Sequence, residues 1–289
     1  MVSFHRGKKE FSGYTSVDTV VTAAYNLALL VQLLWTATAT PPDPTTLLHE
    51  SIQAEKENRK RSFNYVWREE IMHAVYSPPG ELVQRDSATY EVLFVEGETY
   101  HRLVARNGKP LDSEETALEQ KKLEEVAAFR RKTPIEERRR RFITAEGRRL
   151  TFTYRLLAEH HKVQLLGEEV FDGRPAWIIE AEPHDAPKPH NRKEWAYVLR
   201  CKLWIDQSTL LPLRMEYTQV KDWDNIPAGS VTEVYFTPVD DVWLAGKIVA
   251  RQEVTKGNRV EINETKQVYS QFHKFAADSI IRWGDPDFR

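Results

Sequence analysis

Apolar and polar residues alternate along much of the chain, most clearly in the segment 202–217. In its second half, single polar or proline residues separate four apolar ones, which are Leu211, Leu213, Met215 and Tyr217. A period of two predicts a β-strand with one apolar face. The short polar segment 207–209 predicts a turn that joins this strand to Leu203–Asp206 as a hairpin. We therefore expect the four apolar side chains on one face of that hairpin.

The same pattern predicts further strands before and after this hairpin. They are expected at residues 63–76, 89–95, 99–105, 163–166, 177–181, 231–236, 242–254 and 260–272. Glycine-containing turns are expected between several of them, at Glu96-Gly97-Glu98, Asn107-Gly108 and Asp172-Gly173. Such short connections join antiparallel neighbours, because parallel strands need a longer crossover. The strands are therefore predicted to form an antiparallel meander.

Two segments follow a helical pattern instead. Asp43-Pro44 combines an acidic N-cap with proline at the first helical position and predicts the start of the first helix of the domain. The second segment, residues 112–146, is rich in Glu, Lys and Arg and is divided by Pro134. Its basic cluster Arg138–Arg141 has two interpretations, a solvated helix face or a contact with membrane phosphates or an acidic partner. Separate helices and strands predict the α+β class.

Residues 1–39 predict a signal peptide region. The apolar run Ala23–Trp35 is too short for a membrane span, which needs about 20 residues, and Ala37-x-Ala39 fits the small-residue cleavage rule. The basic residues at 5–9 lie further upstream than usual, which fits an overlong N-terminus; the alternative is a buried first helix. Export predicts a periplasmic protein, soluble after cleavage near Ala39, with residues 40–289 as a single domain. No cysteine comes directly after the apolar run, so a lipid anchor is not expected.

The composition is globular and narrows the classes of function. Of 289 residues, 41% are hydrophobic and 29% are charged, and the formal net charge of -2 gives no overall field that would attract nucleic acid. Cys201 is the only cysteine, which excludes an intramolecular disulfide and a cysteine-based zinc site. We expect Cys201 to be a small buried residue.

The sequence contains no pattern that predicts catalysis. H-E-x-x-H, G-x-S-x-G and the glycine-rich phosphate loops are absent. Histidines include the neighbours His160 and His161 and the loop residues His184 and His190, but a metal site needs three or four converging ligands. We therefore predict no enzyme activity, no metal and no cofactor. A hydrolase that uses loop histidines is the least favoured alternative.

Two stretches carry a resemblance to a known family, G-E-E-V-F-D-G-R-P-A-W at 167–177 and L-W-I-D-Q-S-T-L-L-P-L-R-M-E at 203–216. With the helix and strands before them, they make residues 45–275 resemble the LolA/LolB-like superfamily and, more narrowly, the bacterial outer membrane lipoprotein-sorting proteins. The resemblance implies a strongly curved antiparallel sheet, an incomplete β-barrel, with helices covering its open side. It also implies that acyl chains bind between sheet and helices. The charged helical segment 112–146 is then an insertion.

On this resemblance we expect a periplasmic carrier or binder of lipid or lipoprotein acyl chains. Seven strand residues are the candidate lining of its hydrophobic cavity: Trp177, Trp204, Leu213, Met215, Tyr217, Phe236 and Trp243. For each of them alone, ordinary core packing is the simpler interpretation. Other expected partners are lipoprotein-handling proteins of the inner or outer membrane, and the chain is expected to be a monomer. The alternative function is a non-transporting envelope sensor or interaction module of the same fold.

Overall fold

The structure is a computed structural model, and it describes residues 41–62, 65–78, 80–138, 140–141, 156–184, 197–223, 226–256 and 259–275. The chain divides into two units, Met1–Pro42 and Asp43–Arg289, and the described helices and strands belong to the second. The predicted signal peptide region, residues 1–39, lies outside the described residues. Export, cleavage and a single domain over 40–289 therefore stay predictions.

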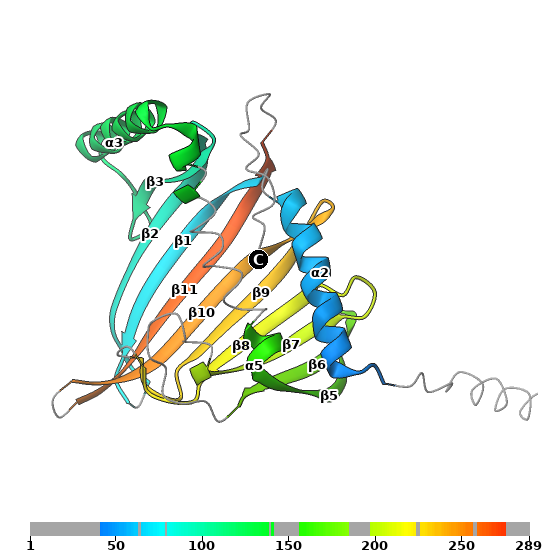
Figure 1. The fold of residues 1–289 in the computed structure, drawn as a ribbon. Coiled ribbons are helices and arrows are strands. Elements are labelled where there is room, and N and C mark those ends of the chain that lie inside the picture. The colour runs from blue at the N-terminus through cyan, green and yellow to red at the C-terminus, as the bar shows by residue number, and fades with distance from the viewer. Residues whose placement is uncertain are drawn as a thin grey trace, which may run out of the picture. The chain divides into compact units, whose positions relative to one another are not determined.

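The second unit is α+β, as predicted, with one large antiparallel sheet and few helices (Figure 1). The helices whose bounds are described are α2 (Pro44–Ser62), α3 (Ser113–Lys132) and α5 (Leu156–His160), and residues 135–138 are also helical. α2 begins at the predicted residue, and the Asp43 carboxylate accepts hydrogen bonds from the backbone N–H and the hydroxyl of Thr46, both at 2.8 Å. Among the described residues, no helix combines the length and apolar composition of a membrane span.

The eleven strands of the sheet are β1 (Tyr65–Tyr76), β2 (Leu82–Val95), β3 (Glu98–Arg106), β4 (Lys109–Pro110), β5 (His161–Phe171), β6 (Arg174–Pro183), β7 (Leu199–Asp206), β8 (Pro212–Gln219), β9 (Val231–Val239), β10 (Val242–Lys256) and β11 (Arg259–Lys274). Their order is β4-β3-β2-β1-β11-β10-β9-β8-β7-β6-β5, and all pairs are antiparallel. Neighbours in the sheet are neighbours in sequence except for β1 and β11. The predicted meander is confirmed, and the β1–β11 pair joins its two ends.

Three predicted turns are confirmed in detail. Glu96-Gly97, Asn107-Gly108 and Asp172-Gly173 all have positive φ at both central positions, with values from 49° to 80°. This combination is the type I′ turn, whose twist matches that of the strands it joins. Glycine adopts positive φ without a steric penalty, which explains its place as the second residue in each turn.

The predicted strong curvature of the sheet is wrong. The sheet is not strongly curled, and its edge strands β4 and β5 are not paired with each other (Figure 1). Sheets acquire sharp curvature from β-bulges and glycine kinks. The long central pair β10–β11 runs from Lys247 opposite Val268 to Lys256 opposite Arg259 without a register shift. The neighbouring pairs do contain register shifts, β9–β10 at Gly246 and β1–β11 between Val66 and Arg68, but these do not curl the sheet strongly.

The main core lies between α2, α5 and strands β5–β8. Leu47 and Leu48 of α2 are 2% and 0% exposed. They belong to one buried cluster with Leu157, Ile179, Ala181, Cys201, Leu203, Ile205 and Met215. Complete burial raises the pKa of the Cys201 thiol, and the expectation of a small buried residue is confirmed. The hydrophobic effect thus fixes the first half of α2 to the β5–β8 side of the sheet.

The second half of α2 is fixed by hydrogen bonds. The side chain of Asn58, which is buried, accepts from the backbone N–H of Trp243 through Oδ1 and donates to its carbonyl through Nδ2, each at 2.7 Å. Because Trp243 lies near the start of β10, α2 is anchored to both β5 and β10. The helix therefore crosses the sheet diagonally rather than following one strand (Figure 1).

The predicted hairpin is confirmed as β7–β8, but its four apolar residues do not share one face. Arg214 and Pro212 of β8 have partners on β7, whereas Leu213 between them has none, so β8 carries a bulge. Met215 and Tyr217 pack on the main core, while Leu213 joins a second cluster with Ala176, Ile178 and Trp204. A bulge reverses the side-chain alternation, which is why the prediction of one shared face fails for Leu213.

Asp206 organises the turn that ends this hairpin. Its carboxylate accepts hydrogen bonds from the backbone N–H groups of Ser208 and Thr209 at 2.9 and 2.7 Å, and from their hydroxyls at 2.5 and 3.0 Å. Arg174 donates to its second oxygen at 3.0 Å. Burial alone would raise the pKa of Asp206, but the hydrogen bonds from Ser208, Thr209 and Arg174 outweigh it and lower that pKa to about 2.

The basic cluster after α3 has a structural role at Arg138. This side chain is 7% exposed and donates to the carboxylate of Glu98 at 2.6 Å and to the carbonyl of Glu96. Arg130 of α3 donates to the carbonyls of Val95, Glu98 and Thr99, each at 2.9 Å. These arginines hold the β2–β3 turn. Neither predicted interpretation applies to Arg138, because its guanidinium is bound within the domain.

We predict that Asn58→Ala lowers the free energy of unfolding by about 2 kcal/mol, because it leaves both backbone groups of Trp243 without their hydrogen-bond partner. Urea denaturation followed by circular dichroism measures this. Lys56→Ala, on the exposed side of the same helix, is the control and is expected to change stability by less than about 0.5 kcal/mol. Equal effects of the two substitutions would contradict the role of Asn58.

A second prediction concerns acid stability. The pKa of Asp206 falls from 3.8 to about 2 on folding, so its ionised form stabilises the fold fully above pH ~4 and loses this effect as the pH falls toward ~2. The linked free energy is about 2 kcal/mol. Urea unfolding at a series of pH values should therefore show a smaller difference between wild type and Asp206→Asn at pH 2 than at pH 5. Asp172→Asn, in the exposed β5–β6 turn, should follow the wild-type pH dependence.

Candidate functional site

The cross-strand register separates the two faces of the sheet. Directly paired residues of antiparallel strands point to the same side. One row of such pairs runs over nine strands, through Ile179, Leu203, Met215, Val234, Ile248, Gln267, Ile71, Ala88 and Arg106. Its first three members lie in the core against α2. The row therefore marks the face that α2 covers, which we call the helix face.

Next to α2 and beyond it, the helix face remains apolar but is only partly buried. Strands β9, β10, β1 and β2 contribute Val234, Phe236, Ile248, Ala250, Ile71, Ala88 and Tyr90, which we call the apolar stripe. Strand β11 lies between β10 and β1 and contributes the polar Gln267 and Thr265. All seven stripe residues have intermediate exposure, whereas the core residues under α2 have almost none. This apolar surface, which the polar residues of β11 interrupt, is a candidate binding site.

The seven predicted lining residues fall into two groups. Trp177, Met215, Tyr217 and Phe236 pack on the main core under α2. Trp204, Leu213 and Trp243 pack in the second cluster, with Ala176 and Ile178. Phe236 alone of the seven also belongs to the apolar stripe. The structure thus brings the predicted residues together in two packed clusters, and their role as lining of a ligand cavity stays a prediction.

The opposite face of the sheet carries cations over aromatic rings. Trp204, Arg214, Tyr235 and Lys247 form a cross-strand row on that face. The Arg214 guanidinium carbon lies 4.3 Å from the Trp204 ring centroid and 5.5 Å from that of Tyr235, and Lys247 Nζ lies 3.8 Å from the Tyr235 centroid. Arg214 also pairs with Glu233 at 2.5 Å. Cation–π contacts and ion pairs of this kind keep a sheet face compatible with water.

Polar side chains border the stripe near β3. Glu69, which is 5% exposed, pairs with Tyr90 across β1 and β2. Its carboxylate lies 3.0 Å from Nδ1 of His101, and the rings of His101 and Tyr90 meet edge to face with centroids 6.4 Å apart. These contacts fix Tyr90 at the end of the stripe, where the apolar surface gives way to polar residues.

Of the two loop histidines in the hydrolase alternative, only His184 lies in the described part of the chain. Among the described residues, no three His, Cys, Asp or Glu side chains gather closely enough to hold a metal ion. His161 is buried, and its Nε2 lies 2.9 Å from the carbonyl oxygen of Leu199. His190 lies outside the described residues. The described geometry gives His161 a structural role.

Sequence analysis missed most of the stripe. Ile248 and Val234 lie on predicted strands, but their neighbours on the helix face, Ile71 and Tyr90, come from the other end of the domain. Only the β1–β11 pair brings them together. Local alternation predicts that Ile71 and Tyr90 lie on strands but not which strand lies beside which. No signal in this single sequence identifies that pairing.

No protein-family model and no curated protein sequence matches the chain. In structure, the chain is similar to a domain assigned to an outer membrane lipoprotein-sorting protein of Vibrio parahaemolyticus, with 13% identity, 78% of this chain and 92% of that chain covered, and a TM-score of 0.34. A DUF1329 family protein from Desulfovibrio piger has 13% identity, coverage of 86% and 98%, and a TM-score of 0.34. The MucA/MucB complex of Pseudomonas aeruginosa has 12% identity, coverage of 82% and 100%, and a TM-score of 0.25. At these values the likeness assigns neither a family nor a function to the chain.

Proposed function

We propose that the protein binds acyl chains of lipids or lipoproteins on the apolar stripe and acts as a carrier or binder of them in the periplasm. The observation that supports this is the stripe itself, a set of partly exposed apolar side chains on β9, β10, β1 and β2 that is interrupted by polar residues at β11. An elongated apolar surface matches an extended hydrocarbon chain, which needs contact area and no catalytic group. The proposal involves no enzyme activity, no metal and no cofactor.

The hydrophobic effect gives such a site enough affinity to function. Each CH₂ group removed from water contributes about 0.8 kcal/mol. About ten such groups would contribute about 8 kcal/mol, from which the cost of association and of ordering the ligand is subtracted, so longer acyl chains bind more tightly. A ligand held mainly by apolar contacts can also be released to a partner, as a carrier requires.

An envelope sensor or interaction module of the same fold is the second candidate, and one observation favours it. Leu118 and Phe129 of α3 are 52% and 57% exposed. Eleven residues correspond to almost exactly three helical turns of 3.6 residues, so both lie on the same side of α3. An exposed apolar pair on a helix suits contact with another protein. This candidate does not require the stripe to bind a lipid.

We predict that a fluorescent fatty acid binds to the full chain and that Ile248→Gln raises its Kd about tenfold, because the substitution removes apolar contact area and places an amide in the stripe. Val249→Gln is the matched control, since Val249 is the next residue of β10 and faces the opposite side of the sheet. It should change the Kd less than twofold. Fluorescence titration measures both, and thermal melts confirm that the variants fold.

Native mass spectrometry of the purified full chain provides an independent measurement. Co-purified lipid that is lost in Ile248→Gln and retained in Val249→Gln would support the carrier. A wild-type protein that retains no lipid and binds no fatty acid would eliminate the carrier in favour of the interaction module. An equal loss of binding in both variants would show that the stripe is not the site.

A further inference from the structure

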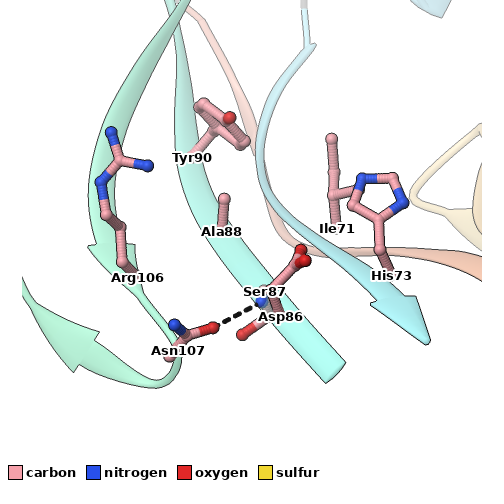
Figure 2. Close-up of a pocket in the computed structure, with 8 residues that line it drawn as sticks. All are labelled: Ile71, His73, Asp86, Ser87, Ala88, Tyr90, Arg106 and Asn107. Atoms are coloured by element: carbon pink, nitrogen blue, oxygen red, sulfur yellow. Dashed lines mark hydrogen bonds between the residues drawn. The ribbon is translucent and has the colours of Figure 1, made fainter. Parts of the chain in front are cut away.

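A small polar pocket lies at the β1–β2–β3 end of the apolar stripe (Figure 2). Its volume is about 210 Å³, and it is lined by Ile71, His73, Asp86, Ser87, Ala88, Tyr90, Arg106 and Asn107. Pockets that hold whole drug-sized ligands measure about 300–1,000 Å³. This pocket is therefore suited to a small polar group rather than to a complete lipid.

The pocket is continuous with the stripe. Ile71, Ala88 and Tyr90 belong to both, so a ligand in the pocket touches the same apolar residues that end the stripe. Figure 2 shows Tyr90 and Ala88 between Arg106 on one side and Ile71 on the other. A molecule with an acyl chain on the stripe would consequently place its polar end here.

Groups of opposite charge line the pocket. Asp86 pairs directly with His73 across β2 and β1, and Arg106 pairs with Ala88, two residues from Asp86 along β2. Diagonal neighbours of this kind lie about 7–8 Å apart. All three polar side chains are exposed to solvent. The pocket thus presents a carboxylate and a guanidinium at a separation that one small ligand can bridge.

The contacts that Arg106 and His73 already make leave part of their hydrogen-bonding capacity available to a ligand. Arg106 Nε lies 3.4 Å from a Glu115 carboxylate oxygen, and both side chains are largely exposed. An exposed pair of this type contributes at most about 1 kcal/mol, and a guanidinium has five N–H donors. His73 is positioned by its Nδ1, 3.0 Å from the Thr265 hydroxyl, so its second ring nitrogen is the one that can contact a ligand.

We infer that this pocket binds a zwitterionic aminoalkyl phosphate, the head group of a lipid such as phosphatidylethanolamine, with Asp86 contacting the ammonium and Arg106 the phosphate. A simple anion would meet the Asp86 carboxylate, and a simple cation would meet the Arg106 guanidinium, so only a ligand with both charges complements the pocket. This inference rests on the proposed function for the acyl chains, and it adds the class of lipid that the protein selects.

The test compares short-chain phosphatidylethanolamine with phosphatidylglycerol of the same chain length, both below their critical micelle concentrations. Isothermal titration calorimetry with the full wild-type chain should give a Kd at least fivefold lower for phosphatidylethanolamine. Asp86→Asn should abolish this preference, because the ammonium loses its carboxylate, and should not weaken the binding of a fluorescent fatty acid, whose own carboxylate Asp86 would repel. Arg106→Gln should weaken binding of both phospholipids about tenfold.

Matched controls lie on the opposite face of the same part of the sheet. Glu264 and Arg85 are both cross-strand partners of Ala74 there. Glu264→Gln and Arg85→Gln remove the same charges as the two test variants and should preserve the wild-type preference. Equal affinity of the wild type for the two phospholipids, or a preference that survives Asp86→Asn, would overturn the inference.

Free O-phosphoethanolamine, followed by NMR, separates the pocket from the stripe. Weaker binding of this compound than of the phospholipid, with the same dependence on Asp86 and Arg106, identifies the lipid as the ligand. If the free compound binds in this way and no acyl probe binds, the pocket stands and the proposed function fails. If acyl probes bind without a head-group preference, the proposed function stands and the pocket inference fails. If neither the free compound nor an acyl probe binds, both the pocket inference and the proposed function fail.

Discussion

A mismatch in size between helix α2 and the sheet determines the arrangement of the domain. Eleven strands spaced about 4.8 Å apart make a sheet about 50 Å wide, whereas the 19 residues of α2 span about 28 Å. That length matches the distance from β5 to β10, the two strands to which α2 is anchored. The apolar residues beside α2 on β9 and β10, and those beyond it on β1 and β2, keep partial exposure and form the apolar stripe.

The two faces of the sheet differ in how their apolar residues are covered. On the opposite face, aromatic residues such as Trp204 and Tyr235 lie beneath the charged groups of Arg214 and Lys247, which hydrate the surface. On the helix face, Ile248 and Ile71 have no such cover from their cross-strand partners, since the residue between them is the uncharged Gln267. The apolar residues of the stripe therefore lack the charged cover that these aromatic residues have on the opposite face.

The fold was largely predictable wherever local sequence determines geometry. Type I′ turns follow from residue pairs such as Asp172-Gly173, and strands follow from alternation, because both depend on neighbouring residues alone. The bulge at Leu213 was not predictable, since it depends on how the turn around Asp206 sets the register between β7 and β8. The degree of curvature was not predictable for a related reason, because the register shifts of the sheet, such as that at Gly246 between β9 and β10, are properties of two strands together.

The candidate site was harder to predict than the fold because it is assembled from both ends of the domain. Ile248 lies on β10 and Ile71 on β1, and they share a surface only through the β11 ladder between them. The chain between β1 and β11 has to close as one long loop, and this closure costs conformational entropy before any contact is made. The β1–β11 pair therefore depends on hairpins that are already formed, such as β10–β11. A surface built in this way exists only in the complete sheet, so neither half of the domain contains the stripe or joins it to the polar pocket.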